Sequence, residues 1–193
     1  MPTVSRAALG LALVALLSAP AALADDVSDR LTAALAAYEA GDLRATTTEL
    51  GGATTALSQK KGALLAAVLP ATPEGWTREI NEDYAAGIAM AGGGTGAEAR
   101  YIDPDGNEIT VNYTMDSPLL AMMIGMFANE QMIAMLGKTV EVNGTRMVDQ
   151  DTGMTTVIDN RILVQINGDE TAKMVPLAQT IDFAALAVFD APK

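Results

Sequence analysis

The chain has 193 residues and a net charge of −12, from 24 acidic and 12 basic residues, and it contains neither cysteine nor histidine. The lack of cysteine excludes disulfides and thiol catalysis, and the lack of histidine removes the commonest general base and transition-metal ligand. An acidic surface repels phosphate groups, so we expect no binding to nucleic acid.

The first 24 residues have the pattern of a secretory signal peptide. Arg6 supplies a positive charge, an apolar run extends from Ala7 to Leu17, and Ala22-Leu23-Ala24 is a small-x-small cleavage site. The run is shorter than the roughly 20 residues that a membrane-spanning helix needs. We therefore expect cleavage after Ala24, a periplasmic or secreted protein, and no stable membrane span after cleavage. A retained N-terminal anchor is the alternative.

Residues 25–70 are predicted to form a helical hairpin. Apolar residues recur at helical spacing in two runs, Val27, Leu31, Leu35 and Tyr38 in the first and Leu50, Ala53 and Leu57 in the second. Gly41-Asp42 is a stop-and-restart signal between the runs, and Pro70 ends the second. The stretch from Ala37 to Leu43 resembles the turn between the helices of a tetratricopeptide repeat, but no second copy follows, so a solenoid is not predicted.

Residues 76–190 predict an antiparallel α+β domain that forms one compact unit with the hairpin. From Ala97 apolar residues alternate with polar ones, and turn signals separate the runs at 104–106, 143–144 and 159–160. A short strand is expected at 77–80, whereas 84–90 is ambiguous between strand and helix. Tight turns between successive strands favour an antiparallel sheet with helices packed on one face, so the predicted fold class is α+β.

A methionine-rich stretch from Ser117 to Gly137 is predicted to be one continuous helix. Ser117 and Pro118 suit a helix start, and Gly137 suits the left-handed residue that closes a helix. The three polar residues 129–131 scatter around the axis, so no solvent-facing stripe emerges. One flank of this helix should therefore pack on the sheet, and the other should be covered by the hairpin, by the segment Phe183 to Phe189, or by a partner.

The uncovered flank is the candidate partner or ligand surface, and it comprises Met123, Phe127, Met126 and Leu119. A glycine-rich loop, with Gly92, Gly93, Gly94 and Gly96, is the candidate mobile segment that could move over this surface. We expect neither a cofactor nor a metal, and we name no catalytic residue.

Three other patterns are weighed against simpler interpretations. Gly92-x-Gly94-x-x-Ala97 fits a dinucleotide-binding pattern, but a strand rather than a helix follows it. The acidic turns at 103–108 and 149–151 lack the glycine and glutamate positions of a calcium-binding loop. The methionines could bind Cu(I), but methionine among Leu, Ile and Phe is more typical of a core.

The sequence therefore predicts an exported, acidic, non-catalytic binding or interaction module whose partner is an unknown protein or a small apolar ligand. The alternative is a periplasmic carrier that holds a small apolar ligand between the methionine-rich helix and the sheet. An enzyme of unknown type is the third interpretation, because no carboxylate pair is singled out by its context. The oligomeric state is not predicted.

Overall fold

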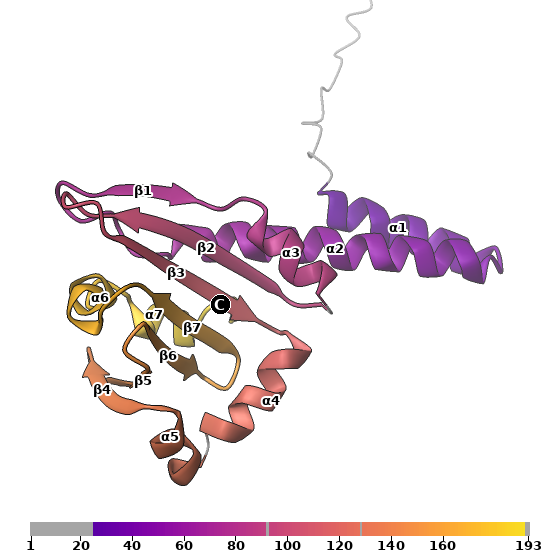
Figure 1. The fold of residues 1–193 in the computed structure, drawn as a ribbon. Coiled ribbons are helices and arrows are strands. Elements are labelled where there is room, and N and C mark those ends of the chain that lie inside the picture. The colour runs from indigo at the N-terminus through magenta and orange to yellow at the C-terminus, as the bar shows by residue number, and fades with distance from the viewer. Residues whose placement is uncertain (1–24, 92, 128, 192–193) are drawn as a thin grey trace, which may run out of the picture.

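A computed structural model describes residues 25–91, 93–127 and 129–191 (Figure 1). The predicted signal peptide at 1–24 lies outside the described residues. The elements are, in chain order, α1 (Asp26–Glu39), α2 (Leu43–Ala67), β1 (Thr77–Ile80), α3 (Tyr84–Met90), β2 (Thr95–Ile102), β3 (Glu108–Met115), α4 (Pro118–Phe127), α5 (Glu130–Leu136), β4 (Lys138–Val142), β5 (Thr145–Asp149), β6 (Gly153–Ile158), β7 (Ile162–Asn167), α6 (Thr171–Ala178) and α7 (Phe183–Ala187). The fold class is α+β, as predicted.

The helical hairpin is confirmed, and its local chemistry explains its ends. The Asp25 carboxylate accepts a hydrogen bond from the Val27 N–H at the start of α1. Gly41 adopts a φ of +77°, which glycine reaches without steric cost, and the Asp42 carboxylate then accepts from the Ala45 N–H, 2.9 Å away, to begin α2. The stop-and-restart signal therefore works as a glycine turn followed by an aspartate cap.

The seven described strands form one antiparallel sheet in the order β1-β2-β3-β7-β6-β5-β4. It consists of two meanders, β1 to β3 and β4 to β7, which meet where β3 pairs with β7 over Thr110↔Asn167 to Met115↔Ile162. Two predicted turns have the left-handed backbone that tight hairpins require: Asn143-Gly144, with φ of 50° and 75°, and Asp159-Asn160, with φ of 49° and 51°.

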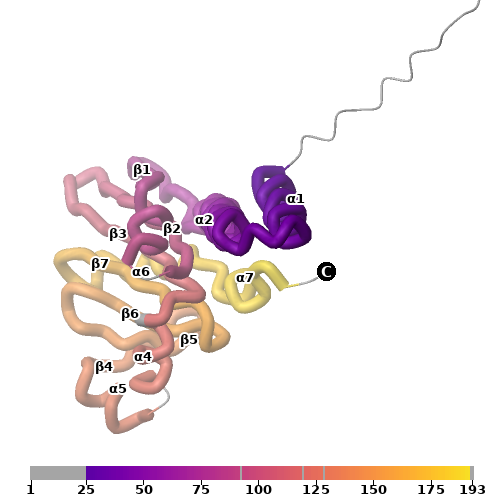
Figure 2. Tube along the Cα trace, turned by 90° about the vertical axis from the view of Figure 1, so that its right-hand side faces the viewer, coloured from indigo at the N-terminus to yellow at the C-terminus, as the bar shows by residue number. Residues whose placement is uncertain are grey.

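One face of the sheet carries the hydrophobic core beneath α2, α6 and α7, and α1 lies on the outer side of α2 (Figure 2). Helix α2 contributes Leu65, and α6 contributes Met174 and Leu177, all fully buried against the inward residues of the central strands. Because Leu65 belongs to this core, the second helix of the hairpin packs directly on the sheet. The described helices include none with the length and apolarity that crossing a membrane requires.

The prediction of one continuous helix from Ser117 to Gly137 is wrong, because the structure has two helices there. Asn129 is extended, with φ −114° and ψ 114°, and its side-chain oxygen accepts from the N–H groups of Gln131 and Met132 to cap α5. An asparagine side chain that bonds the backbone in this way competes with helix continuation. Gly137 is also extended, at φ 167°, and is required because a side chain would clash with the carbonyl of Asp149.

Helices α4 and α5 connect β3, in the middle of the sheet, to β4 at its far edge (Figure 1). They lie against Val148, Thr155 and Gln165, which alternate along their strands with the core residues Met147, Met154 and Val164. Because successive strand residues point to opposite faces, α4 and α5 cover the face that the core helices leave free. The core-forming helices thus share one face, as predicted, and the methionine-rich segment crosses the other.

Candidate functional site

The structure brings three of the four predicted surface residues together on the sheet side of α4. Met123, Met126 and Phe127 are half-buried and line a cavity of about 80 Å³ with Val148 and other sheet residues. Leu119 lies in α4, and its side chain is outside the described part of the structure. On the outward flank Met122 is 73% exposed. The predicted surface is therefore mainly the contact between α4 and the sheet.

Neither segment expected to cover the outward flank of α4 does so. Helix α2 of the hairpin and the segment from Phe183 to Phe189 both pack into the core on the opposite face of the sheet. Alanine and glycine at 121 and 125 leave that flank with little apolar side chain beyond Met122. The exposed part of α4 is consequently small.

The glycine-rich loop is anchored to α2 at its C-terminal end. Gly92 lies outside the described residues. The carbonyl of Gly94 accepts from Ser58 Oγ at 2.7 Å, and Thr95 Oγ1 donates to the Ser58 carbonyl at 2.6 Å, so two bonds tie the loop to α2. Gly94, at φ +105°, could not carry a side chain, whose Cβ would lie 2.8 Å from the Met115 carbonyl oxygen. This geometry argues against a lid, although mobility itself stays a prediction.

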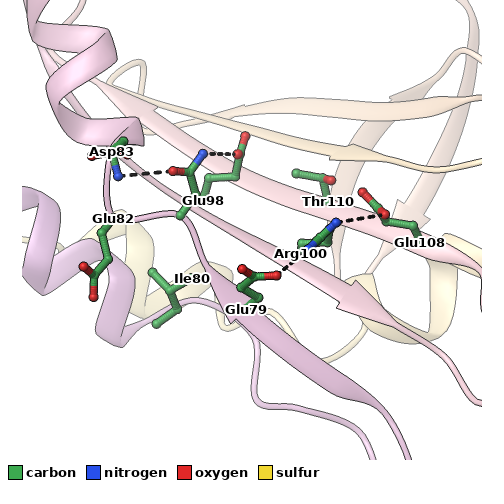
Figure 3. A pocket seen from close by; sticks show the side chains of 9 residues that line it. Glu79, Ile80, Glu82, Asp83, Glu98, Arg100, Glu108 and Thr110 are labelled. Atoms are coloured by element: carbon green, nitrogen blue, oxygen red, sulfur yellow. Dashed lines mark hydrogen bonds and ion pairs between the residues drawn. The ribbon is translucent and has the colours of Figure 1, made fainter.

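A groove of about 490 Å³ lies beside β1 and the N-terminal end of α3 (Figure 3). Its lining is mainly acidic: Glu79, Ile80, Asn81, Glu82, Asp83, Glu98, Arg100, Glu108 and Thr110. Arg100 pairs with Glu79 and, at 3.4 Å, with Glu108, and the ion pair with Glu79 raises the Arg100 pKa. The sequence did not reveal this groove, because its residues come from three strands and a loop that only the sheet register brings together.

Several polar groups of the acidic groove are engaged with one another. Asn81 Nδ2 donates to one oxygen of Glu98 at 2.8 Å and Asn112 Nδ2 to the other at 3.4 Å, so that carboxylate is already engaged. In the described part of the chain no three acidic side chains converge to hold a metal ion. The acidic turn residues are engaged as well: Asp103 accepts from Asn107, and Asp149 accepts from Thr171 at 2.6 Å.

A second charged cluster ties the C-terminal segment to α2. Lys61 Nζ lies 2.6 Å from Asp116 and 2.9 Å from Asp190, and Arg161 contacts the same two carboxylates at 3.2 and 2.9 Å. Hydrogen bonding from Arg161 and Lys61 holds the Asp190 pKa below its ordinary value, although burial opposes this shift. Each charge has a partner of opposite sign, so the cluster acts as a structural clamp.

The largest unexplained feature is an apolar face on the helical hairpin. The two helices contact each other through small residues, since Ala34, Ala53 and Ala56 are buried between them. The larger apolar side chains are exposed by 47–66%: Leu31, Leu35 and Tyr38 of α1 and Leu43, Leu50, Leu57 and Leu64 of α2. We call these seven residues the leucine face.

The residues of the leucine face lie on one side of the hairpin. Arg30 pairs with Glu49 at 3.6 Å and covers Gly52. These three residues therefore lie on the side of the contact between α1 and α2 that is opposite the leucine face. At 100° per residue, Leu31 and Tyr38 lie on the flank of α1 away from Arg30, and Leu50 and Leu57 lie on the flank of α2 away from Gly52. The exposed side chains of both helices therefore form one continuous surface.

The sequence indicated these apolar stripes but not their exposure. Helical spacing suggested that these side chains would be buried. Because α1 and α2 approach each other closely through alanine and glycine, the larger side chains lie beside the contact between the two helices instead. The overlooked signal is the seven-residue spacing of Leu43, Leu50, Leu57 and Leu64, which is the repeat of a helix that packs along its length against another helix.

The fold and its surfaces define an antiparallel α+β protein with a projecting helical hairpin. No family model, curated protein or solved structure matches the chain.

Proposed function

We propose that the protein is an exported, non-catalytic interaction module that binds its partner through the leucine face. The observation that carries this proposal is the size of the face. With about 200 Å² for a fully exposed side chain of this size, seven residues exposed by about half present roughly 700 Å². The largest apolar patch of an ordinary monomer is about 300 to 600 Å², and larger patches mark interaction sites.

The proposal that the protein is non-catalytic is supported by its acidic side chains, several of which already have hydrogen-bond or ion-pair partners. Asp149, the buried acidic residue of the described part of the chain, accepts a hydrogen bond from Thr171, and the carboxylates of Glu98 and Asp190 are engaged by amides or cations. The chain has no histidine or cysteine to act as base or nucleophile. Export rests on the sequence of residues 1–24 and remains part of the proposal.

The alternative function, a carrier of a small apolar ligand beneath the methionine-rich segment, has less support. The cavity that Met123, Met126 and Phe127 line has a volume of about 80 Å³. Pockets for small molecules are usually about 300 to 1,000 Å³. A space of about 280 Å³ that Phe127 also lines has Arg146 and polar strand residues in its lining as well as apolar ones.

Photo-crosslinking in cells that produce the full chain tests the proposed surface. A photoreactive amino acid at Thr54, which lies beside the stripe of Leu50 and Leu57, should give crosslinked adducts. The same amino acid at Thr48, also exposed and on the opposite side of α2, should give none or far fewer. Equal crosslinking from the two positions, or none from Thr54, would contradict binding through the leucine face.

A further inference from the structure

We propose that the occupant of the leucine face is a second copy of this chain, packed antiparallel so that two hairpins form a four-helix bundle. The inference rests on the proposed function and names its partner. It follows from the spacing of the leucines, the area of the face and the distribution of charge.

The spacing of the leucines fits a partner helix of similar length. Leu43, Leu50, Leu57 and Leu64 repeat every seven residues along α2, and each is about half exposed. A seven-residue repeat stays in contact with a partner helix over many turns when the two supercoil gently, as in helical bundles. Helix α2 has 25 residues and is therefore about 37 Å long, enough for four such layers.

The area of the face fits a dimer. Stable protein interfaces bury about 800 Å² per partner, and the leucine face presents roughly 700 Å² before neighbouring exposed residues such as Thr54 are counted. A two-fold axis between Leu50 and Leu57 makes the surface self-complementary. It places Leu43 opposite Leu64 of the second copy and Leu50 opposite Leu57.

The charge distribution favours self-association through the hairpin over self-association through the sheet. Residues 25–67 contain six acidic and four basic residues, a net charge of −2. Residues 68–193 contain eighteen acidic and seven basic residues, a net charge of −11, so two sheets repel each other. The hairpin also pairs much of its own charge, as Arg30 with Asp26 and Glu49 and as Lys60 with Asp25.

The same charges decide the orientation. The hairpin projects beyond the sheet, with the turn at Gly41 at its far end (Figure 1). A parallel arrangement would bring the two acidic sheets side by side, whereas an antiparallel one holds them at opposite ends of the bundle. Because like charges repel less at larger separation, the antiparallel arrangement is favoured.

The oligomeric state of purified protein tests the inference. Protein from cells that express the full chain should have twice the mass of one chain by sedimentation equilibrium and native mass spectrometry. The intact mass also shows whether residues 1–24 are present. Leu50→Glu with Leu57→Glu should weaken dimerisation by about a hundredfold or more, because four carboxylates would enter the centre of the interface.

The control adds the same charge elsewhere. Met122→Glu with Met135→Glu changes two residues that are 73% and 82% exposed on α4 and α5, and should leave the dimer intact. Circular dichroism checks that each variant folds. If the glutamate variant is a folded monomer, mixing it with a Leu50→Lys, Leu57→Lys variant should restore a dimer by charge pairing, which loss of fold could not produce.

The orientation is tested by disulfide formation, for which the cysteine-free chain is a clean background. A mixture of Leu43→Cys and Leu64→Cys proteins should oxidise mainly to the mixed disulfide. Disulfides between two copies of the same variant would overturn the antiparallel arrangement.

A monomeric protein would overturn self-association through the leucine face, whether or not residues 1–24 are still attached to it. A dimer that survives the two glutamates would overturn it as well. A monomer that still crosslinks to another protein through Thr54 in cells would refute the second copy while leaving the proposed interaction function intact.

Discussion

Two buried tyrosines on neighbouring strands differ in a single hydrogen bond. Tyr101 and Tyr113 are both fully buried in the core. Tyr101 Oη donates to the Pro70 carbonyl at 2.6 Å, which fastens the end of the hairpin to the sheet. Tyr113 Oη is buried without a hydrogen-bond partner among the described residues. Removing the hydroxyl should therefore have different consequences for stability at the two sites.

Tyr101→Phe should lower the free energy of unfolding by about 1 to 2 kcal/mol, because it leaves the Pro70 carbonyl unpaired. Tyr113→Phe should leave stability unchanged or raise it by up to about 1 kcal/mol, because it removes an unsatisfied polar group. Urea denaturation measures both values. A loss from Tyr113→Phe as large as that from Tyr101→Phe would mean that both hydroxyls are satisfied.

The same tyrosines predict how stability depends on alkaline pH. Burial raises the pKa of Tyr101 from 10.0 to about 12, although Arg78 opposes the shift, and burial raises the pKa of Tyr113 still further. Since the unfolded chain loses these protons first, their contribution is complete below pH 10 and is lost as the pH rises towards 12. The Tyr113→Phe variant should lose less stability over this range than the unchanged protein.

At the scale of the element, the break between α4 and α5 is set by one side chain. Asn129 interrupts the methionine-rich segment and caps α5, which has seven residues. A helix this short depends strongly on its caps and on contacts with the rest of the protein. Ile133, the buried residue of α5, supplies the main such contact.

Asn129→Ala should therefore lower the free energy of unfolding by about 1 kcal/mol and speed amide hydrogen exchange in α5. Gln131→Ala, at an exposed position of the same helix, should have little effect. Alanine favours helix more than asparagine does. If α4 and α5 formed one continuous helix in solution, Asn129→Ala would instead raise stability, so the sign of the change distinguishes the two arrangements.

Elements with local causes were predictable from sequence. Gly41-Asp42 marks the hairpin turn, and Asn143-Gly144 and Asp159-Asn160 mark two tight strand connections, because each of these pairs supplies its own backbone geometry or cap. The break at Asn129 was missed because apolar content continues across it. A pattern of hydrophobicity does not detect a single capping side chain.

Features that depend on distant contacts were not predictable. The exposure of Leu31 and Leu50 depends on how closely Ala34 and Ala53 let two helices approach. The acidic groove exists only because Arg100 lies opposite Glu79 in the register of β1 and β2. Of the predicted surface, Met123, Met126 and Phe127 do lie together, but they face the sheet because α4 crosses the face that the core helices leave free.

At the scale of the whole molecule, charge is divided between two regions. The hairpin has a net charge of −2 and carries the apolar surface, whereas the region that contains the sheet has a net charge of −11. A chain arranged in this way can associate through one end and stay soluble through the other.

The junction of the two meanders, where β3 pairs with β7, affects the rate at which the chain folds. Within each meander the strands are joined by connections of 2 to 14 residues, so their contacts form over shorter sequence distances than the pairing of β3 with β7. The pairing of Val111 with Ile166 closes a loop of 54 intervening residues, which is slow because long loops cost more entropy to close. We expect the docking of the two meanders to be the rate-limiting step of folding.

Val111→Ala at this junction should therefore slow refolding, whereas Val142→Ala in the edge hairpin should mainly speed unfolding. Both valines are buried, at 0% and 2% exposure, so the substitutions are matched and each should cost about 2 kcal/mol. Stopped-flow folding and unfolding in urea separate the two rates. Similar slowing of refolding by both variants would show that the edge hairpin forms together with the junction.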